Sequence, residues 1–151
     1  MKPSLDNAGA KACLADVNVL LALLVSHHEH HKVAFKWFDR LGAGEAGLCR
    51  WVQLALVRLL GNRHIMGQYA TSALEAWALT EELQQDERVY FLAEPASAHT
   101  IFPSLLHYSV PTAKLVGDAW LAAHAFAART RLVTLDSGFR QFKGLDLTVL
   151  K

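Results

Sequence analysis

LADVNVL, residues 14–20, is the stretch on which the fold depends. It is apolar apart from Asp16 and Asn18, and a carboxylate is costly to bury unless another group pairs with it. The apolar run that ends just before Asp16, residues 13–15, predicts a buried strand. Asn18 is placed to cap a helix that continues to Val25. Asp16 is therefore expected at the carboxyl end of a strand.

Two further apolar runs carry an aspartate, Asp118 within residues 117–121 and Asp136 at the end of residues 132–136. Taken singly, Asp118 fits a helix acid favoured by the helix dipole, and Asp136 fits an ordinary turn residue. Three carboxylates that meet at one place would repel one another unless a cation compensates their charge. We therefore expect Asp16, Asp118 and Asp136 to surround Mg²⁺ or Mn²⁺, a device suited to cleaving phosphodiesters.

The composition indicates one well-packed domain. The chain of 151 residues is 52% hydrophobic and 19% charged, which predicts a single domain over residues 1–151, with residues 1–11 as a loose tail. The formal net charge of +1 excludes a general basic surface, so a polyanion needs a local patch. Cys13 and Cys49 are expected as core thiols of a cytoplasmic protein, and the apolar run 17–25 is too short to span a membrane.

Alternating strand and helix patterns predict an α/β fold, a three-layer α/β/α sandwich with a mostly parallel sheet. In such sheets ligands bind at the carboxyl ends of the strands. The helix over 51–60 is expected to bury Leu54 and Val57, and Thr71 is expected to cap the next helix, with Glu75 one position beyond a capping box. The predicted strands are 13–15, 46–49, 89–93, 132–135 and 147–150, and the predicted helices are 18–25, 30–41, 51–60, 71–84, 96–108 and 111–129.

Four motifs lie in order along residues 13–151. They are Leu-Ala-Asp16-Val-Asn18-Val-Leu, Cys49-Arg50-Trp51-Val52-Gln53-Leu54 followed by Arg58-Leu59-Leu60, Val116-Gly117-Asp118-Ala119, and Leu132-Val-Thr134-Leu-Asp136-Ser-Gly-Phe139. In this order and spacing they resemble the PIN domain, and more narrowly the VapC ribonuclease toxins of toxin–antitoxin pairs. The resemblance implies an α/β/α sandwich, a magnesium-dependent endoribonuclease that leaves 5′-phosphate and 3′-hydroxyl ends, a VapB-type antitoxin that covers the site, and a homodimer.

The resemblance also implies roles for particular residues. The metal-binding acids match Asp16, Asp118 and Asp136, and the polar residues beside them match Asn18 and Thr134. Where many members carry a glutamate on the third helix, this chain carries Gln53, which is expected to take part in catalysis as a neutral amide. The loss of one negative charge at Gln53 should weaken cation binding.

Basic and aromatic side chains beside the third helix are candidates for RNA contact. Arg50, Arg58 and Arg63, with His64, form the expected basic patch, and compensation of the helix dipole by Arg58 and Arg63 is an equal alternative. The tryptophans are expected as core or interface anchors. Trp51, next to Arg50, is the exception, as a residue that could stack on a base.

Several alternatives stay open beside this hypothesis. His27 and His31 have the spacing of a zinc-chelating pair, but a solvated helix junction is favoured because no further ligand lies near them. A weakened PIN-like domain that mainly binds RNA or a protein partner is the second functional possibility. A Rossmann-like enzyme is disfavoured because GxGxxG and GxxxxGK[ST] are missing. The apolar helices between residues 33 and 83 are the expected walls of an antitoxin groove.

Overall fold

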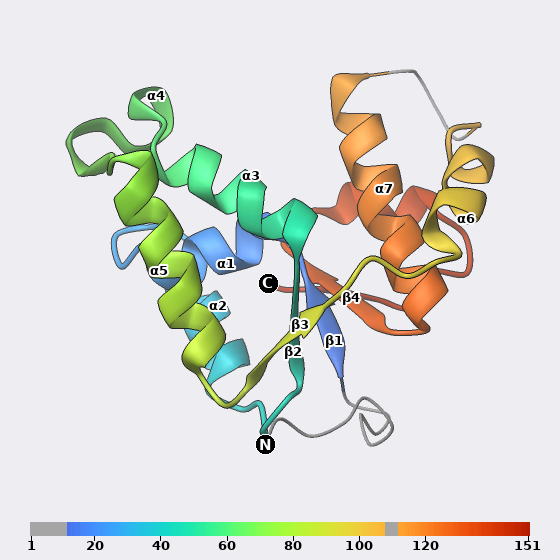
Figure 1. The fold of residues 1–151 in the computed structure, drawn as a ribbon, viewed down its shortest axis with the longest axis horizontal. Helices are drawn as coiled ribbons and strands as arrows, with labels where there is room; N and C mark the ends of the chain where they lie inside the picture. The colour runs from blue at the N-terminus through green and yellow to red at the C-terminus, as the bar shows by residue number, and fades with distance from the viewer. Residues whose placement is uncertain (1–11, 108–111) are drawn as a thin grey trace.

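A parallel five-stranded sheet forms the centre of the computed structural model, which describes residues 12–107 and 112–151. The strands lie in the order β3-β2-β1-β4-β5, so the first strand of the chain is the central one (Figure 1). Leu14 on β1 pairs with Gly47 on one side and with Leu132 on the other. The strands are β1 (Cys13–Ala15), β2 (Ala46–Cys49), β3 (Val89–Leu92), β4 (Arg131–Thr134) and β5 (Leu147–Val149).

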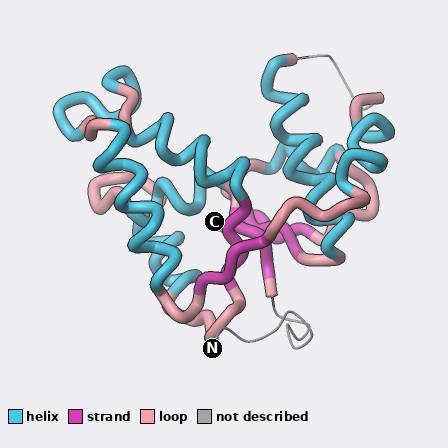
Figure 2. Tube along the Cα trace, in the orientation of Figure 1, coloured by secondary structure: helices cyan, strands magenta, loops and turns pink. Residues whose placement is uncertain are grey.

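Helices lie on both sides of the sheet, which confirms the predicted α/β/α sandwich (Figure 1 and Figure 2). The helices that link β1 to β2 and β2 to β3 lie on one side, and those that link β3 to β4 lie on the other. The first group is α1 (Val17–Leu24), α2 (His31–Phe38), α3 (Arg50–Leu60), α4 (Arg63–Met66), the 3-10 helix η2 (Gly67–Tyr69) and α5 (Ala73–Gln85). The second group is α6 (Ala98–Leu105) and α7 (Ala113–Ala128), and the 3-10 helix η3 (Ser137–Gln141) links β4 to β5.

Small residues allow close packing at the sheet. The buried face of α7 is rich in alanine, with residues 119, 122, 123 and 125 at most 1% exposed. A Cβ on Gly47 would lie 2.7 Å from the carbonyl oxygen of Cys13 and 2.8 Å from the hydroxyl of Tyr90. Only glycine therefore fits at this place in β2. Cys13 and Cys49 are both buried and free, as predicted.

The order in which the chain adds strands to the sheet reverses at β1. It first builds β2 and β3 on one side of β1 and then crosses to build β4 and β5 on the other side. The carboxyl ends of β1 and β4 therefore flank a topological switch point, where open α/β sheets bind ligands. Asp16 follows β1 directly, and Asp136 follows β4 by two residues. The topology thus brings these two acids to one edge of the sheet, as the sequence predicts.

Two helix starts differ from the predictions. Asp16, and not Asn18, caps α1, because its carboxylate accepts a hydrogen bond from the first amide of the helix. Ser72, and not Thr71, caps α5. The Ser72 hydroxyl accepts from the amide of Glu75, whose carboxylate accepts from the amide of Ser72, so the capping box is complete.

One helix face also differs. Leu54 points outward with 52% of its surface exposed, so its predicted burial is wrong, whereas Val57 is half-buried. The helix predicted over 96–108 is the shorter α6, which contains Pro103. The predicted loose tail, residues 1–11, lies outside the described residues, as do residues 108–111. Within the described part of the chain, every helix is too short or too polar to cross a membrane.

Candidate active site

Asp16 lies at the junction of β1 and α1 and is only 7% exposed. Its Oδ1 accepts a hydrogen bond from the amide of Val17, and its Oδ2 accepts one from the hydroxyl of Thr134, each at 2.7 Å. Burial raises the pKa of this carboxyl above its ordinary value, and the two hydrogen bonds oppose that rise. Asp16 is therefore a desolvated acid whose orientation is set by donors from two different elements.

The hydroxyl of Thr134 connects the groups around Asp16. Besides donating to Asp16, it accepts hydrogen bonds from Nδ2 of Asn18 at 3.2 Å and from the amide of Asp136 at 3.0 Å. Oδ1 of Asn18 accepts a hydrogen bond from the amide of Leu135 at 3.1 Å. The structure thus brings Asn18 and Thr134 next to two of the three acids, where they can hold the loop after β4 against the start of α1.

Asp118 and Asp136 differ in their surroundings. Asp118 is half-buried on α7, and burial together with the charges of Asp16 and Asp136 raises its pKa to about 6, although the Lys114 ammonium acts in the opposite direction. Lys114 donates a hydrogen bond to Oδ2 of Asp136 and forms an ion pair with it. Burial tends to raise the pKa of Asp136, but Lys114 and the Gly138 amide outweigh it and lower that pKa. Lys114 therefore acts on the pKa of all three acids, which share one electrostatic environment.

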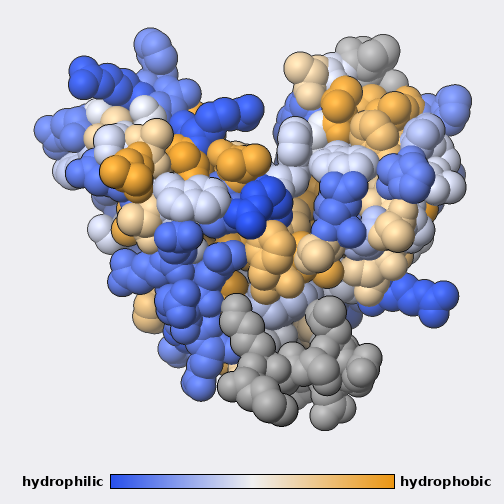
Figure 3. All heavy atoms as spheres, in the orientation of Figure 1, coloured by the Kyte–Doolittle hydropathy of each residue, from blue (hydrophilic) through white to orange (hydrophobic). Residues whose placement is uncertain are grey.

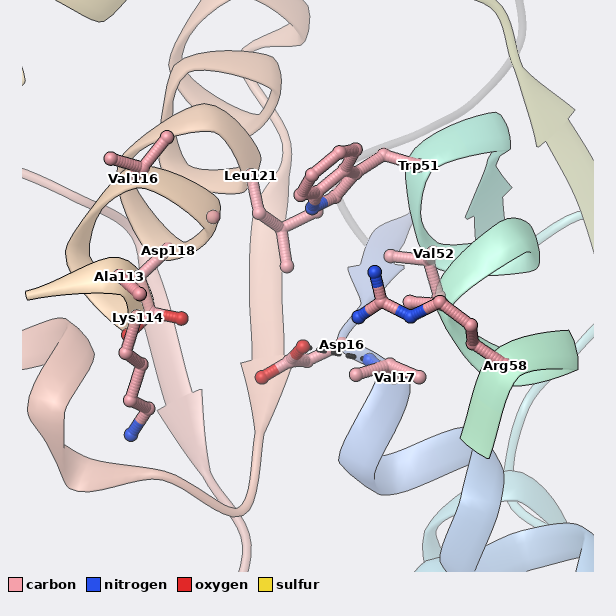
Figure 4. Close-up of a pocket in the computed structure, with 12 residues that line it drawn as sticks. Asp16, Val17, Trp51, Val52, Arg58, Ala113, Lys114, Val116, Asp118 and Leu121 are labelled. Carbon is pink, nitrogen blue, oxygen red and sulfur yellow. Dashed lines mark hydrogen bonds between the residues drawn. The ribbon is translucent and has the colours of Figure 1, made fainter. Parts of the chain in front are cut away.

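A cleft of about 440 Å³ lies between α3 and α7. Figure 3 shows the molecule hollowed between its two groups of helices. Asp16 and Asp118 line this cleft together with two cationic side chains, Arg58 from α3 and Lys114 from α7 (Figure 4). Its apolar lining includes Trp51, Val52, Val116 and Leu121. Acidic, basic and apolar groups therefore meet in one place.

The donor chemistry of this cleft suits a hard divalent cation, because Mg²⁺ and Mn²⁺ prefer carboxylate oxygens. Among the described residues, no three acid, histidine or cysteine side chains already stand together as a finished metal site. The Lys114 ammonium lies beside Asp136, where it supplies the positive charge. The acids fit a metal ion by their chemistry, and an ion bound at Asp136 would compete with the Lys114 ammonium for Oδ2 of that carboxylate.

Gln53 does not line this cleft. It is fully buried, its Nε2 donates to the hydroxyl of Thr80 on α5 at 3.0 Å, and its Oε1 accepts a hydrogen bond from Arg50. Both ends of its amide are thus engaged inside the protein, and the catalytic role of Gln53 stays a prediction. The face of α3 that lines the cleft includes Ala55 and Arg58, which are not acids.

The predicted basic patch is divided among three places. Arg58 lines the cleft with the acids. The guanidinium of Arg50 lies 5.5 Å from the ring centroid of Trp77 and 4.8 Å from that of Phe91. Arg63 begins α4 and lines a different hollow. The three arginines therefore do not form a joint surface, and Arg58 is the one placed to meet a ligand of the cleft.

The helical spacing of the sequence contains a signal for Lys114, which was not among the predicted site residues, and for the shared face of Trp51 and Arg58. Lys114 precedes Asp118 by four residues, which places both side chains on one face of α7. Trp51 precedes Arg58 by seven residues, or about two helical turns, so both lie on one face of α3. A Cβ on Gly117 would meet Cζ2 of Trp51 at 3.5 Å, so this indole reaches across the cleft to α7.

The histidine-rich segment at residues 27–31 forms a helix junction, as favoured. Nδ1 of His31 donates a hydrogen bond to the carbonyl of Ala22 at 2.8 Å. The ring of His27 lies against that of Tyr69, with 4.2 Å between centroids. In residues 12–107 and 112–151, these histidines belong to no cluster of three metal-ligating side chains.

Known proteins resemble this chain in sequence and in fold. The PIN domain family matches residues 13–145. Ribonuclease VapC41 of Mycobacterium tuberculosis (strain H37Rv) is 37% identical over 142 residues, which cover 91% of this chain and 97% of the relative. Ribonuclease VapC37 of the same strain is 33% identical, over 87% of this chain and 92% of the relative.

Solved structures agree with the fold at low sequence identity. VapC20 of Mycobacterium tuberculosis, described as a Sarcin-Ricin loop cleaving toxin, is 13% identical with a TM-score of 0.68, over 89% of this chain and 98% of that one. VapBC2 of Rickettsia felis, bound to a DNA fragment from its promoter, is 13% identical with a TM-score of 0.65, over 93% and 99% of the two chains. The chain therefore belongs to the PIN-domain family, as a relative of the VapC ribonucleases.

Proposed function

We propose that this protein is a divalent-metal-dependent endoribonuclease and the toxin of a VapBC-type toxin–antitoxin pair, acting in the cytoplasm. The observation that carries the proposal is the cleft at the switch point, where Asp16 and Asp118 lie beside Arg58 and Lys114. Carboxylates suit a metal cation and basic side chains suit a phosphate, so this one cleft has both requirements for phosphodiester hydrolysis. The names of the relatives, which are ribonucleases, support RNA as the substrate.

Asp16, Asp118 and Asp136 would hold the ion, which we propose to be Mg²⁺, with Mn²⁺ as the alternative. A bound ion of this kind activates water and offsets charge on the phosphoryl oxygens. Asp118, which lines the cleft with Asp16, would help to direct the attacking water toward phosphorus. Lys114, which lines the same cleft, would stabilise the negative charge on the 3′ oxygen as its bond to phosphorus breaks. The products would carry 5′-phosphate and 3′-hydroxyl ends.

The expected partner besides RNA is a VapB-type antitoxin. Several structural neighbours are VapBC complexes, which supports a partner of this kind. The helices between residues 33 and 83 expose large apolar side chains that suit such a contact. They are Phe35 (54% exposed), Leu54 (52%), Ile65 (51%) and Leu74 (79%). A homodimer stays a prediction.

A second candidate function has one observation in its favour. The cleft face of α3 carries Ala55 and Arg58 rather than an acid, which lowers the negative charge available to a cation. A protein of this kind could bind RNA or a partner without cleaving it. Calorimetric titration separates the two functions, because a binding-only protein should take up neither Mg²⁺ nor Mn²⁺ specifically.

The direct test is RNA cleavage by the purified protein with Mg²⁺, with EDTA, and after Asp16→Asn. The amide keeps an oxygen for the Val17 hydrogen bond that starts α1, so the variant should fold and yet lose nearly all cleavage. Asp39→Asn, at an exposed acid after α2, is the matched control and should cleave as the wild type does. Cleavage that survives both EDTA and Asp16→Asn would overturn the proposed mechanism.

A further inference from the structure

The strongest unexplained feature of the cleft is the pair Trp51 and Arg58 on α3. Trp51 is 43% exposed although it is a large aromatic side chain, and its indole reaches toward Gly117 across the cleft. Arg58 extends over the cleft near Asp16 (Figure 4). Within the described residues, its guanidinium makes neither a hydrogen bond nor an ion pair. The indole face and the guanidinium N–H groups are therefore available to contact a ligand that enters the cleft beside the acids.

We propose that Trp51 and Arg58 form a nucleotide subsite, in which the indole stacks on one unpaired RNA base and the guanidinium binds the adjoining phosphate. The proposal deepens the proposed ribonuclease function and rests on it. Aromatic faces stack on any base, and a guanidinium binds phosphate oxygens through paired N–H groups. The two side chains stand about two turns apart on one helix face, which is a suitable spacing for the base and phosphate of the same nucleotide.

The shape and charge of the cleft support a nucleotide rather than a protein segment. Its volume, about 440 Å³, is within the range of small-ligand sites. A basic peptide drawn to Asp16 and Asp118 would meet the positive charges of Arg58 and Lys114 on both walls, whereas an anionic phosphodiester would be attracted by them. Trp51 also needs an exposed base face, so base-paired RNA would not satisfy it.

The test of Trp51 combines a protein variant with a change in the RNA. Trp51→Leu should lower kcat/KM on a short single-stranded RNA by about 5- to 150-fold, and Trp51→Phe should recover part of that loss. A series of RNAs, each with the base removed at a different position, is then assayed with the wild-type protein. Removal of the base at one position next to the cleaved bond should lower kcat/KM by a similar factor. At that position Trp51→Leu should cause little further loss, because the stacking partner is already missing. Tyr69→Leu, at an exposed aromatic residue on η2 outside this cleft, is the matched control and should leave kcat/KM unchanged.

Stacking also has a readout that does not depend on cleavage. In the Asp16→Asn background, added RNA should quench tryptophan fluorescence, and Trp51→Phe in the same background should remove most of that quenching. Arg58→Gln should lower kcat/KM by about tenfold. It should also reduce, by about one, the slope of the logarithm of the RNA binding constant against the logarithm of the salt concentration. Arg40→Gln, at an exposed arginine just after α2, should leave both values unchanged.

The outcomes separate this proposal from the function on which it rests. If the wild type cleaves no RNA with Mg²⁺ or Mn²⁺, the proposed ribonuclease function fails. If the wild type cleaves RNA and Trp51→Leu cleaves it equally well, or if the losses from Trp51→Leu and the missing base multiply, the subsite is wrong. If Trp51→Leu weakens an antitoxin complex but not RNA cleavage, Trp51 belongs to a protein interface and the proposal is also overturned.

Discussion

Removal of one carboxylate should stabilise the metal-free protein. Asp118 has a pKa of about 6, against an ordinary value of 3.8, because burial and two neighbouring acids disfavour its charged form. A carboxyl whose pKa is raised by folding holds its proton more tightly in the folded protein than in the unfolded chain. Its cost to stability is therefore small near pH 4, grows between about pH 4 and pH 6, and is complete above pH 6. Asp118→Asn removes that cost and should therefore raise the free energy of unfolding at pH 8, in EDTA.

The size of the stabilisation by Asp118→Asn follows from the pKa shift of Asp118. Two pKa units correspond to ~3 kcal/mol for a fully shielded group. Because Asp118 is half-buried, solvent screening leaves about 1 kcal/mol, which is about 2–4 °C in melting temperature for a chain of this length. Calorimetric melting of both proteins at pH 4 and pH 8 measures it. With Mg²⁺ the order should reverse, because the wild type gains stability from binding and the variant does not.

A control of opposite sign exists in the same chain. The hydrogen bond from Arg88 lowers the pKa of Asp86, so Asp86→Asn should reduce stability at pH 8. A lower melting temperature for Asp118→Asn at pH 8 in EDTA would refute the reasoning. An increase of the same size at pH 4 and pH 8 would refute it too, because the charge of Asp118 would then not be its cause.

Three further substitutions test other parts of the structure. Gln53→Ala should lower the free energy of unfolding in urea by about 2 kcal/mol, because it leaves Thr80 without its buried donor, while calorimetric Mg²⁺ affinity stays unchanged. Lys114→Gln should strengthen Mg²⁺ binding about threefold by freeing Asp136, and it should cost less than ~1 kcal/mol of stability because Lys114 is 65% exposed. Gly47→Ala should cost about 3 kcal/mol in the same urea assay, because its Cβ would press on the Cys13 carbonyl. Gly42→Ala should cost far less, because the nearest atoms to its Cβ belong to the flexible side chain of Glu45.

The layers and the acid positions were predictable from the sequence. Short apolar runs alternate with longer amphipathic ones, and parallel strands that are joined by helices end at the same edge of a sheet. That rule alone placed Asp16 and Asp136 together. Asp118 follows from its place near the start of α7, whose alanine-rich face packs on the sheet.

The orientation of α3 was not predictable in the same way. Its sequence, RWVQLALVRLL, is apolar on nearly every side, so the pattern does not tell which residues face the core. Leu54 was expected inside and is exposed, whereas Gln53 was expected in the site and is buried. The burial of Gln53 depends on Thr80, a hydrogen-bond partner 27 residues away on another helix. The contact of Lys114 with Asp136 likewise spans 22 residues and depends on the tertiary fold.

The two hydrogen bonds on Asp16 have a thermodynamic consequence. Each carboxylate oxygen already holds one donor, from Val17 and from Thr134, so the side chain has lost its rotational freedom before any ligand arrives. Ordering a free side chain would cost entropy at the moment of binding, and here that cost has been met during folding. A metal ion or a substrate that meets Asp16 therefore encounters a preorganised ligand whose remaining lone pairs already have fixed directions.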